Sequence, residues 1–157
     1  MEGALQDGLF DHQVPSEVLP TARGAYRTPV PLEPGLVGSA ALTVCDSDTA
    51  LYLGSGDVPV LATPSVVLLS ERATVQAVEG HVDAGQTTVG YRVQLDHLAP
   101  VPVGDEVLAE AVLESVEGRR LTFRVSVKHR DGLVAAGRIT RVVVERSRFL
   151  GKAAGTS

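Results

Sequence analysis

The most regular alternation of apolar and polar residues lies in the C-terminal half of the chain. Over residues 121–128, apolar side chains at every second position alternate with polar ones. This is the period of a strand that is buried on one face. Asp131-Gly132 predicts a hairpin turn, and residues 133–144 predict the strand that follows it. With two further strands over residues 87–98 and 106–116, the pattern predicts an antiparallel meander of four strands.

A long helix is expected before these strands. Residues 65–78 predict it, with Thr63 as the N-cap and Pro64 at the first helical position, where a missing N–H costs nothing. Upstream, residues 36–45 predict a first strand, and Asp46–Asp48 are suited to cap a short helix that runs through Leu53. One long helix against one antiparallel sheet is an α+β layer architecture.

The ends of the chain differ from this regular region. Five of the nine prolines fall within residues 1–35, spaced too closely for a helix to run between most of them. We interpret this segment as an extended arm draped on the domain or, equally, as a disordered leader. The predicted domain covers residues 36–149, and the small, polar residues 150–157 are expected to form a flexible tail.

Composition narrows the class of protein. Hydrophobic residues make up 44% and charged residues 21%, so the chain can form a substantial core. No apolar run approaches the ~20 residues of a membrane span, and the acidic N-terminus does not resemble a signal peptide. Cys45 is the only cysteine, which excludes an internal disulfide and a multi-cysteine zinc site. We expect a cytoplasmic protein that does not associate with membranes.

Charge and the known ligand-binding motifs exclude further functions. Fourteen basic against 19 acidic residues give a net charge of −5, and aromatic residues make up only 4%. Both values argue against binding to nucleic acid. His81 and Asp83 could form half of a metal site, but no third ligand lies near them in the sequence. No Walker loop or dinucleotide-binding motif is present, so we expect neither a metal nor a cofactor.

Glu71 is the most informative position on the predicted helix. At ~100° per residue it lies roughly 120° from the polar stripe, among apolar residues. The stripe contains Ser65, Arg72 and Gln76, and the apolar neighbours are Val67, Leu68, Val75 and Val78. We therefore expect the helix to be largely buried. A carboxylate on its apolar side needs a partner or a chemical task. It is either an ion-paired structural residue or a catalytic acid.

Two other residues could act with Glu71. Thr63 lies at the helix N-terminus, where unpaired N–H groups and the positive dipole end can polarise a carbonyl, although capping alone would explain a threonine. His97 ends a predicted strand, where a histidine is more often a packing or surface residue. It becomes a candidate catalytic residue if it faces Glu71.

Over roughly residues 36–149, the sequence resembles the hotdog-fold thioesterases, and most of all the fluoroacetyl-CoA thioesterase group. The spacing of threonine, glutamate and histidine carries this resemblance, because all three match together. The other matching stretches are Thr88-Val89-Gly90, His97-Leu98-Ala99-Pro100-Val101-Pro102-Val103-Gly104, residues 116–123 and residues 141–144.

The resemblance implies a hotdog fold, in which an antiparallel sheet wraps around one long central helix. It implies a homodimer, or a tetramer of two dimers, with each site at the interface of two protomers. The implied reaction is hydrolysis of an acyl-CoA or acyl-pantetheine thioester with a small or medium acyl group. Thr63, Glu71 and His97 match the catalytic residues, and Gly90 and Arg141 match substrate-site residues. On the residue chemistry, Glu71 could be the nucleophile or the base that activates water.

Two other functions stay open from the sequence. A hotdog hydratase or dehydratase would act on acyl-CoA or acyl-carrier-protein substrates, but such enzymes commonly carry an Asn-Pro-x-His type of loop, which this sequence lacks. A dimer that binds an acyl ligand without catalysis is the other alternative. The presence of all three matching residues disfavours it.

Overall fold

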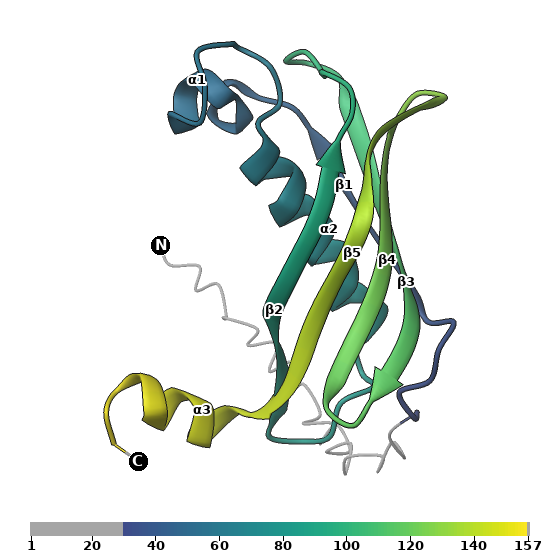
Figure 1. Ribbon diagram of the computed structural model, residues 1–157, viewed down its shortest axis with the longest axis vertical. Coiled ribbons are helices and arrows are strands. Elements are labelled where there is room, and N and C mark those ends of the chain that lie inside the picture. The colour runs from purple at the N-terminus through teal and green to yellow at the C-terminus, as the bar shows by residue number, and fades with distance from the viewer. Residues whose placement is uncertain (1–29, 157) are drawn as a thin grey trace, which may run out of the picture.

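Five antiparallel strands curl around one long helix in the computed structural model, which describes residues 30–156 (Figure 1). The strand order is β1-β3-β4-β5-β2, so β1 and β2 form the two edges of the sheet. The strands are β1 (Val37–Thr43), β2 (Gln86–His97), β3 (Glu106–Glu117), β4 (Arg120–His129) and β5 (Gly132–Glu145). This confirms the predicted α+β architecture and the hotdog arrangement that the family resemblance implies. The prediction of a four-strand meander is wrong for β2, which pairs with β5 and not with β3.

Helix α2 (Thr63–Ala77) lies in the concave side of the sheet and contacts β1 and β3 most extensively. The helix packs closely against β1, since a Cβ atom at Gly38 would overlap the backbone of Ala73 and Ala77. Its buried side therefore consists mainly of small residues, namely Ser65, Ser70, Ala73, Thr74 and Ala77. Val66 and Leu69 are the larger buried residues. The core between helix and sheet is completed by inward residues of the strands, such as Leu113, Leu121, Phe123, Val125 and Ile139.

The side of α2 that carries Glu71 is not buried within the protomer. Leu68 is 51% exposed and Val75 48% exposed, so the prediction of a largely buried helix is wrong for a single chain. Ser65, which we assigned to an exposed polar stripe, is buried instead. The reason is the close approach of α2 to β1, which selects the small side chains for the interior and leaves larger apolar ones outside.

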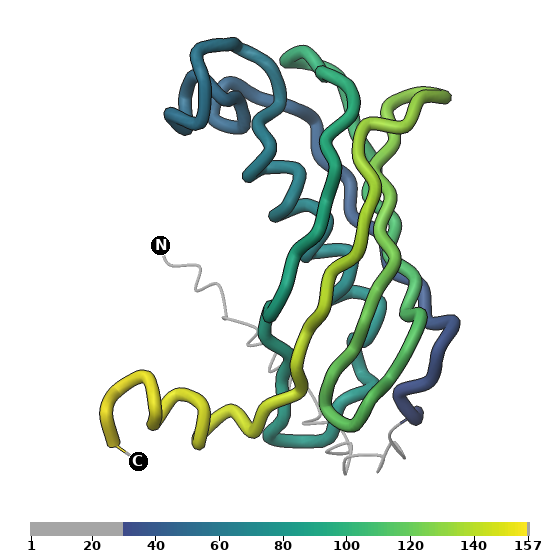
Figure 2. Tube along the Cα trace, in the orientation of Figure 1, coloured from purple at the N-terminus to yellow at the C-terminus, as the bar shows by residue number. Residues whose placement is uncertain are grey.

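The segment before α2 lies beyond the N-terminal end of that helix (Figure 2). It contains a single 3-10 turn, η1 (Asp46–Asp48), and one short helix, α1 (Ala50–Leu53), which ends at the predicted residue. Thr49 caps this helix by accepting a hydrogen bond from the Tyr52 N–H (3.3 Å), so the prediction that Asp46–Asp48 cap it is wrong. Isolated bridges join Thr49 to Leu61 and Val60 to Pro102. The segment is thereby attached to the loop that follows β2.

Helix α3 (Arg146–Ala153) continues directly from β5 and extends past the edge strand β2 (Figures 1 and 2). The sequence analysis did not predict this helix. Glu145 caps it, accepting hydrogen bonds from the backbone N–H groups of Ser147 (3.4 Å) and Arg148 (2.8 Å). The helix crosses the expected boundary at residue 149, while the flexibility of residues 150–157 stays a prediction.

Residues 1–29 of the expected arm lie outside the described residues. The remainder of that segment contacts the domain: Leu32 is partly buried against the core, and His81 Nδ1 donates to the carbonyl oxygen of Val30 (3.1 Å). Within residues 30–156, no helix is both long and apolar enough to cross a membrane.

Strand β2 contains a bulge near its middle. Gly90 pairs with Arg141 of β5 and Arg92 pairs with Thr140, so Tyr91 has no opposite residue. Most side chains of β2 are partly or fully exposed, as expected at the edge of a sheet.

Candidate active site

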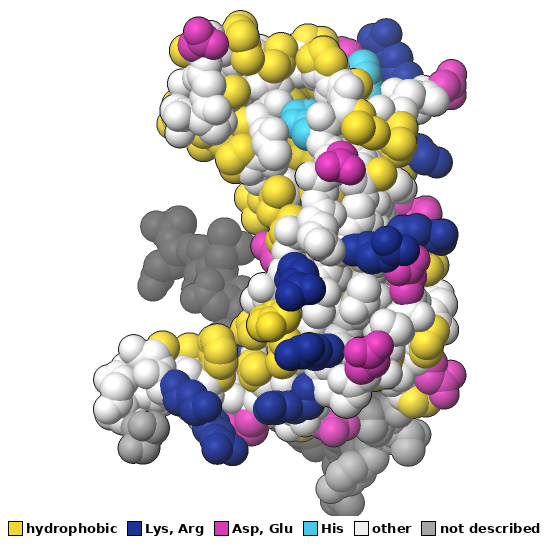
Figure 3. Space-filling model, in the orientation of Figure 1, with side chains coloured by type: hydrophobic (Ala, Val, Ile, Leu, Met, Phe, Trp, Pro, Cys, Tyr) yellow, Lys and Arg dark blue, Asp and Glu magenta, His cyan; other side chains and the backbone are white. Residues whose placement is uncertain are grey.

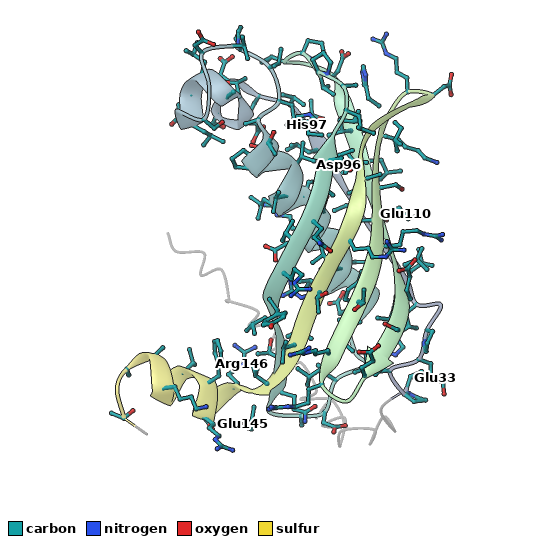
Figure 4. All side chains as sticks on the ribbon, viewed as in Figure 1. Glu33, Asp96, His97, Glu110, Glu145 and Arg146 are labelled. Atoms are coloured by element: carbon teal, nitrogen blue, oxygen red, sulfur yellow. The ribbon has the colours of Figure 1, made fainter. Side chains whose placement is uncertain are left out.

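Thr63 and His97 form one half of the candidate site. The N-cap of α2 is Ala62, so Thr63 is the first helical residue and the prediction that it caps the helix is wrong. Its hydroxyl is instead 2.9 Å from Nδ1 of His97, the last residue of β2. Figure 4 shows His97 at this end of β2, beside the start of α2. Because neither the Thr63 hydroxyl nor the His97 imidazole caps the helix, both are available for catalysis.

His97 lines a hollow in the protein surface, and its second ring nitrogen is buried. Nε2 is buried and has no hydrogen-bond partner among residues 30–156. The adjacent hollow has a volume of about 330 Å³, and its wall includes Thr63, Ala50, Val58, Leu61, Leu98 and Pro100. An unpaired buried nitrogen is costly in a folded protein, and a bound ligand is one way to satisfy it.

Glu71 belongs to a second group of polar residues. Arg141 Nη1 lies 3.4 Å from Glu71 Oε1. Arg141 Nε donates to the side-chain oxygen of Thr88 and Nη2 donates to its carbonyl oxygen, both at a distance of 3.0 Å. The Arg141 side chain is 8% exposed and that of Glu71 is 32% exposed. Burial lowers the pKa of Arg141 from its usual value, and the carboxylate of Glu71 opposes this shift by raising it. The guanidinium remains protonated and orients Glu71.

Gly90 creates the space that Glu71 occupies. A Cβ atom at Gly90 would overlap Oε1 of Glu71, so the absence of a side chain lets the carboxylate lie against β2. The family resemblance assigns this glycine to the substrate site. In the protomer, the neighbouring group is the acid itself.

The structure separates these residues into two groups within one chain. Eight residues separate Thr63 from Glu71 on α2, which is about 12 Å along the helix axis. Thr63 and His97 therefore meet at the start of the helix, whereas Glu71, Gly90 and Arg141 meet two turns further on. The sequence suggested one cluster of three and did not show this separation.

Thr88 is a residue that the sequence analysis quoted without a role. It holds Arg141 through two hydrogen bonds and thereby fixes the partner of Glu71. Its position two residues before Gly90 was the available signal, because alternate residues of a strand share one face. Among the described residues, no three His, Cys, Asp or Glu side chains are close enough together to hold a metal ion.

Comparison with known proteins identifies the family. A sequence model of the fluoroacetyl-CoA-specific thioesterase family matches residues 44–147. The fluoroacetyl-CoA thioesterase of Streptantibioticus cattleyicolor is 36% identical over 93 residues, which are 59% of this chain and 67% of that protein.

Solved structures agree with the sequence comparison. A structure of the fluoroacetyl-CoA thioesterase FlK superimposes with a TM-score of 0.74 and 28% identity, covering 80% of this chain and 98% of that one. A thioesterase superfamily member of Thermus thermophilus superimposes with a TM-score of 0.74 and 26% identity, covering 80% of this chain and 93% of that one. With a matched region that contains all five candidate residues, the chain belongs to the fluoroacetyl-CoA-specific thioesterase family and is a thioester hydrolase with the hotdog fold.

Proposed function

We propose that two copies of this acyl-CoA thioesterase complete each active site, with Thr63 and His97 from one protomer and Glu71 from its partner. The observation that carries the proposal is the Thr63–His97 hydrogen bond at the start of α2, with Glu71 about 12 Å away along the same helix. A single chain cannot apply all three groups to one thioester carbonyl at that separation.

The spacing of four of these residues along the chain supports a two-fold axis that would unite them. Thr63 and Glu71 are equally distant from Val67 on α2. Gly90 and His97 are equally distant from the peptide between Val93 and Gln94 on β2. A two-fold axis that passes beside both midpoints, perpendicular to the helix and to the strand, would bring Glu71 close to the partner's His97, because symmetry exchanges the two ends of each segment.

The surface around this axis supports a homodimer. Within residues 30–156, no strand pairs with the outer edge of β2, and unpaired edges readily accept another strand. Leu68 (51% exposed), Val75 (48%) and Val93 (40%) expose apolar area on α2 and β2, on both sides of the axis. A second copy would cover this area and bury the side of α2 that the sequence predicts to be buried. A tetramer would require a further interface.

The proposed chemistry assigns each residue a task. The N-terminus of α2 polarises the thioester carbonyl, and its oxygen becomes negative when a nucleophile adds to the carbon. The Thr63–His97 hydrogen bond orients the imidazole, which protonates the departing CoA thiolate. Glu71, oriented by Arg141, attacks the carbonyl or removes a proton from the attacking water. Overall, water cleaves the C–S bond and yields a carboxylic acid and free CoA.

The size of the site favours a small or medium acyl group. The hollow beside Thr63 and His97 has a volume of about 330 Å³, at the lower end of the range for ligand sites.

The exposed thiol of Cys45 supports a reducing, cytoplasmic location for the reaction.

A panel of acyl-CoAs with a thiol-reactive dye tests the reaction itself. Release of free CoA is the expected result. A change in enoyl absorbance without CoA release would indicate the hydratase alternative. Saturable binding with neither signal would indicate the non-enzymatic acyl-binding dimer.

Mixing two inactive variants tests the shared site. Glu71→Gln and His97→Ala should each reduce turnover on the order of 10²–10⁴-fold while remaining folded. After subunit exchange, half of the dimers are mixed, and each mixed dimer holds one intact site. We therefore expect recovery of about a quarter of the parent activity from the mixture. If both residues acted within one protomer, mixing would restore nothing, and the shared-site proposal would be wrong.

A further inference from the structure

Helix α3 packs against very little of its own protomer. None of its residues is buried, and its main contacts are with β5, from which it continues. Phe149 is 42% exposed and Leu150 is 57% exposed. Apart from its first two residues, the helix lies beyond residues 44–147, which match the family. The exposed apolar side chains of α3 are therefore a feature of this chain that neither its own core nor the family match explains.

The direction of α3 is fixed at its first turn. The Glu145 side chain accepts a hydrogen bond from the N–H of Arg148 (2.8 Å), and the N–H of Arg146 donates to the carbonyl oxygen of Gly85 (2.9 Å). Glu145 also pairs with Gln86, the first residue of β2. The helix therefore leaves the sheet at the start of the edge strand and extends past that edge, as Figure 1 shows.

The two exposed apolar residues of α3 face different sides of the sheet. Phe149 lines a hollow on the outer face, together with Val142 of β5. Leu150 lies four residues after Arg146, so these two side chains share one face of the helix. Arg146 lines a hollow together with Val75 of α2. Leu150 is thus presented on the side of the sheet where α2 lies, with no partner segment of its own.

The opposite end of the protomer has a complementary composition. It consists of residues 44–62, which precede α2, and residues 96–105, which end β2 and lead to β3. We call it the aspartate-rich end, because the two segments contain five aspartates and neither lysine nor arginine. Helix α3 contains three basic residues and no acidic one. Among residues 30–156, none of these basic residues forms a salt bridge, and neither do Asp46, Asp57 and Asp96.

Apolar side chains are exposed at the aspartate-rich end as well. They are between 42% and 69% exposed and comprise Leu51, Tyr52, Leu53, Val58, Leu98 and Val103. Figure 3 shows apolar side chains over the segment that contains α1, and basic side chains around α3 at the other end of the molecule. The twelve residues of β2 separate the two ends by about 40 Å, so they cannot meet within one chain.

The two-fold arrangement proposed above brings the two ends together. In it, the two β2 strands run antiparallel, and Gly90 lies near the partner's His97. Residues that precede Gly90 then lie beside residues that follow the partner's His97. Because α3 begins beside Gln86 and extends past the edge of β2, it reaches the aspartate-rich end of the second copy.

We propose that α3 is a clasp that docks on the aspartate-rich end of a second copy of the chain. Leu150 packs against the partner's Leu98 and the partner's Val103, and the basic residues of α3 face the unpaired aspartates. A two-fold dimer holds two such clasps. Leu98 also lines the hollow beside Thr63 and His97, so each clasp covers the rim of that hollow in the other protomer. This inference rests on the proposed dimer, but the shared site does not require it.

A disulfide between introduced cysteines tests the contact directly. In a Cys45→Ser background, Leu150→Cys is combined with Leu98→Cys or with Val103→Cys. We expect at least one pair to give a covalent dimer on mild oxidation, which requires Cα atoms within about 7 Å. Leu108→Cys replaces the second cysteine in the matched control, because Leu108 is 47% exposed on β3, two strands away from β2. The control should run as a monomer on a non-reducing gel.

Leu150→Ala tests the contribution of the clasp to assembly. The variant loses one apolar contact in each clasp, and we expect the dimer dissociation constant, measured by sedimentation, to rise by about tenfold or more. Turnover per protomer should then fall on dilution and return at higher protein concentration, which a folding defect would not reproduce. Leu108→Ala should leave both the dissociation constant and the dilution profile unchanged.

The outcomes separate the clasp from the shared site. A protein that is dimeric by light scattering but cross-links through neither pair would overturn the clasp and leave the shared site standing. An unchanged dissociation constant for Leu150→Ala would also overturn the clasp. Cross-linking without any recovery of activity in the mixture of Glu71→Gln and His97→Ala would support the clasp and contradict the shared site. A monomer at every concentration would overturn both.

Discussion

Replacement of Gly90 by alanine should impair catalysis with little effect on stability. The new methyl group would overlap Oε1 of Glu71, which is the end of a flexible side chain that is 32% exposed. The carboxylate can therefore swing toward solvent. The partly exposed ion pair with Arg141 that is lost contributes about 0–1 kcal/mol. Alanine in a strand gains roughly 0.5–1 kcal/mol over glycine. The two effects offset each other, and we expect the unfolding free energy to change by less than about 1 kcal/mol.

The expected effect on turnover is much larger. A displacement of about 1 Å of a reacting group can cost about 10²-fold in rate, and the carboxylate must move at least that far to clear a methyl group. The assay pairs a thermal melt with thiol release from an acyl-CoA. Gly38→Ala is the matched control, because its methyl group would overlap the backbone of α2, which cannot move aside. That variant should unfold at a clearly lower temperature. A folded Gly90→Ala protein with parental turnover would refute the role given to Glu71.

Three further predictions concern the helix ends and the arm. Thr63→Val should change the unfolding free energy by less than about 1 kcal/mol, because Thr63 is not the N-cap. Turnover should fall in Thr63→Val, which loses the hydrogen bond to His97, and Thr63→Ser should retain turnover. Hydrogen bonds, first from the Arg148 N–H and then from the Ser147 hydroxyl, hold the pKa of Glu145 below its usual range. Glu145 therefore stabilises α3 above the pKa of the unfolded carboxyl, and this contribution is lost as pH falls through the folded pKa. NMR shifts of residues 146–153 should report fraying on acidification, and Glu145→Gln should remove that pH dependence. Deletion of residues 1–33 should give a lower melting temperature than deletion of residues 1–29, because Leu32 packs against the core. Equal melting temperatures for the two deletions would contradict a stabilising role of Leu32.

The sequence predicted β3, β4 and β5 well because each of these strands has one buried face. It placed β2 wrongly beside β3, because β2 buries no residue and its pairing with β5 depends on packing. The alternation over residues 121–128 identified β4, and Asp131-Gly132 lies at the turn before β5. The position of α2 also followed from Thr63 and Pro64, within two residues at its start. These signals are local, so they require no knowledge of what packs against each element.

Features that depend on packing were predicted less well. The burial of α2 was assigned from the hydrophobicity of its side chains, whereas the close approach to Gly38 decides which side faces the sheet. Helix α3 was missed because it is only eight residues long, buries no residue and continues directly from strand β5. The candidate residues were found by resemblance, but their separation into two groups depends on the length of α2 and on the register of β2.

The bulge at Tyr91 changes the phase of strand β2. In a regular strand, odd and even positions face opposite sides, so Gly90 and His97 could not both point toward α2. Gly90 nevertheless faces Glu71, and His97 reaches Thr63 on the same side. The unpaired residue between Gly90 and Arg92 shifts the alternation by one position and makes this possible. Removal of one residue at this point would restore strict alternation along the strand. One of the two halves of the candidate site would then turn to the outer face of the sheet. A search for related sites by strict strand alternation would pass over this chain.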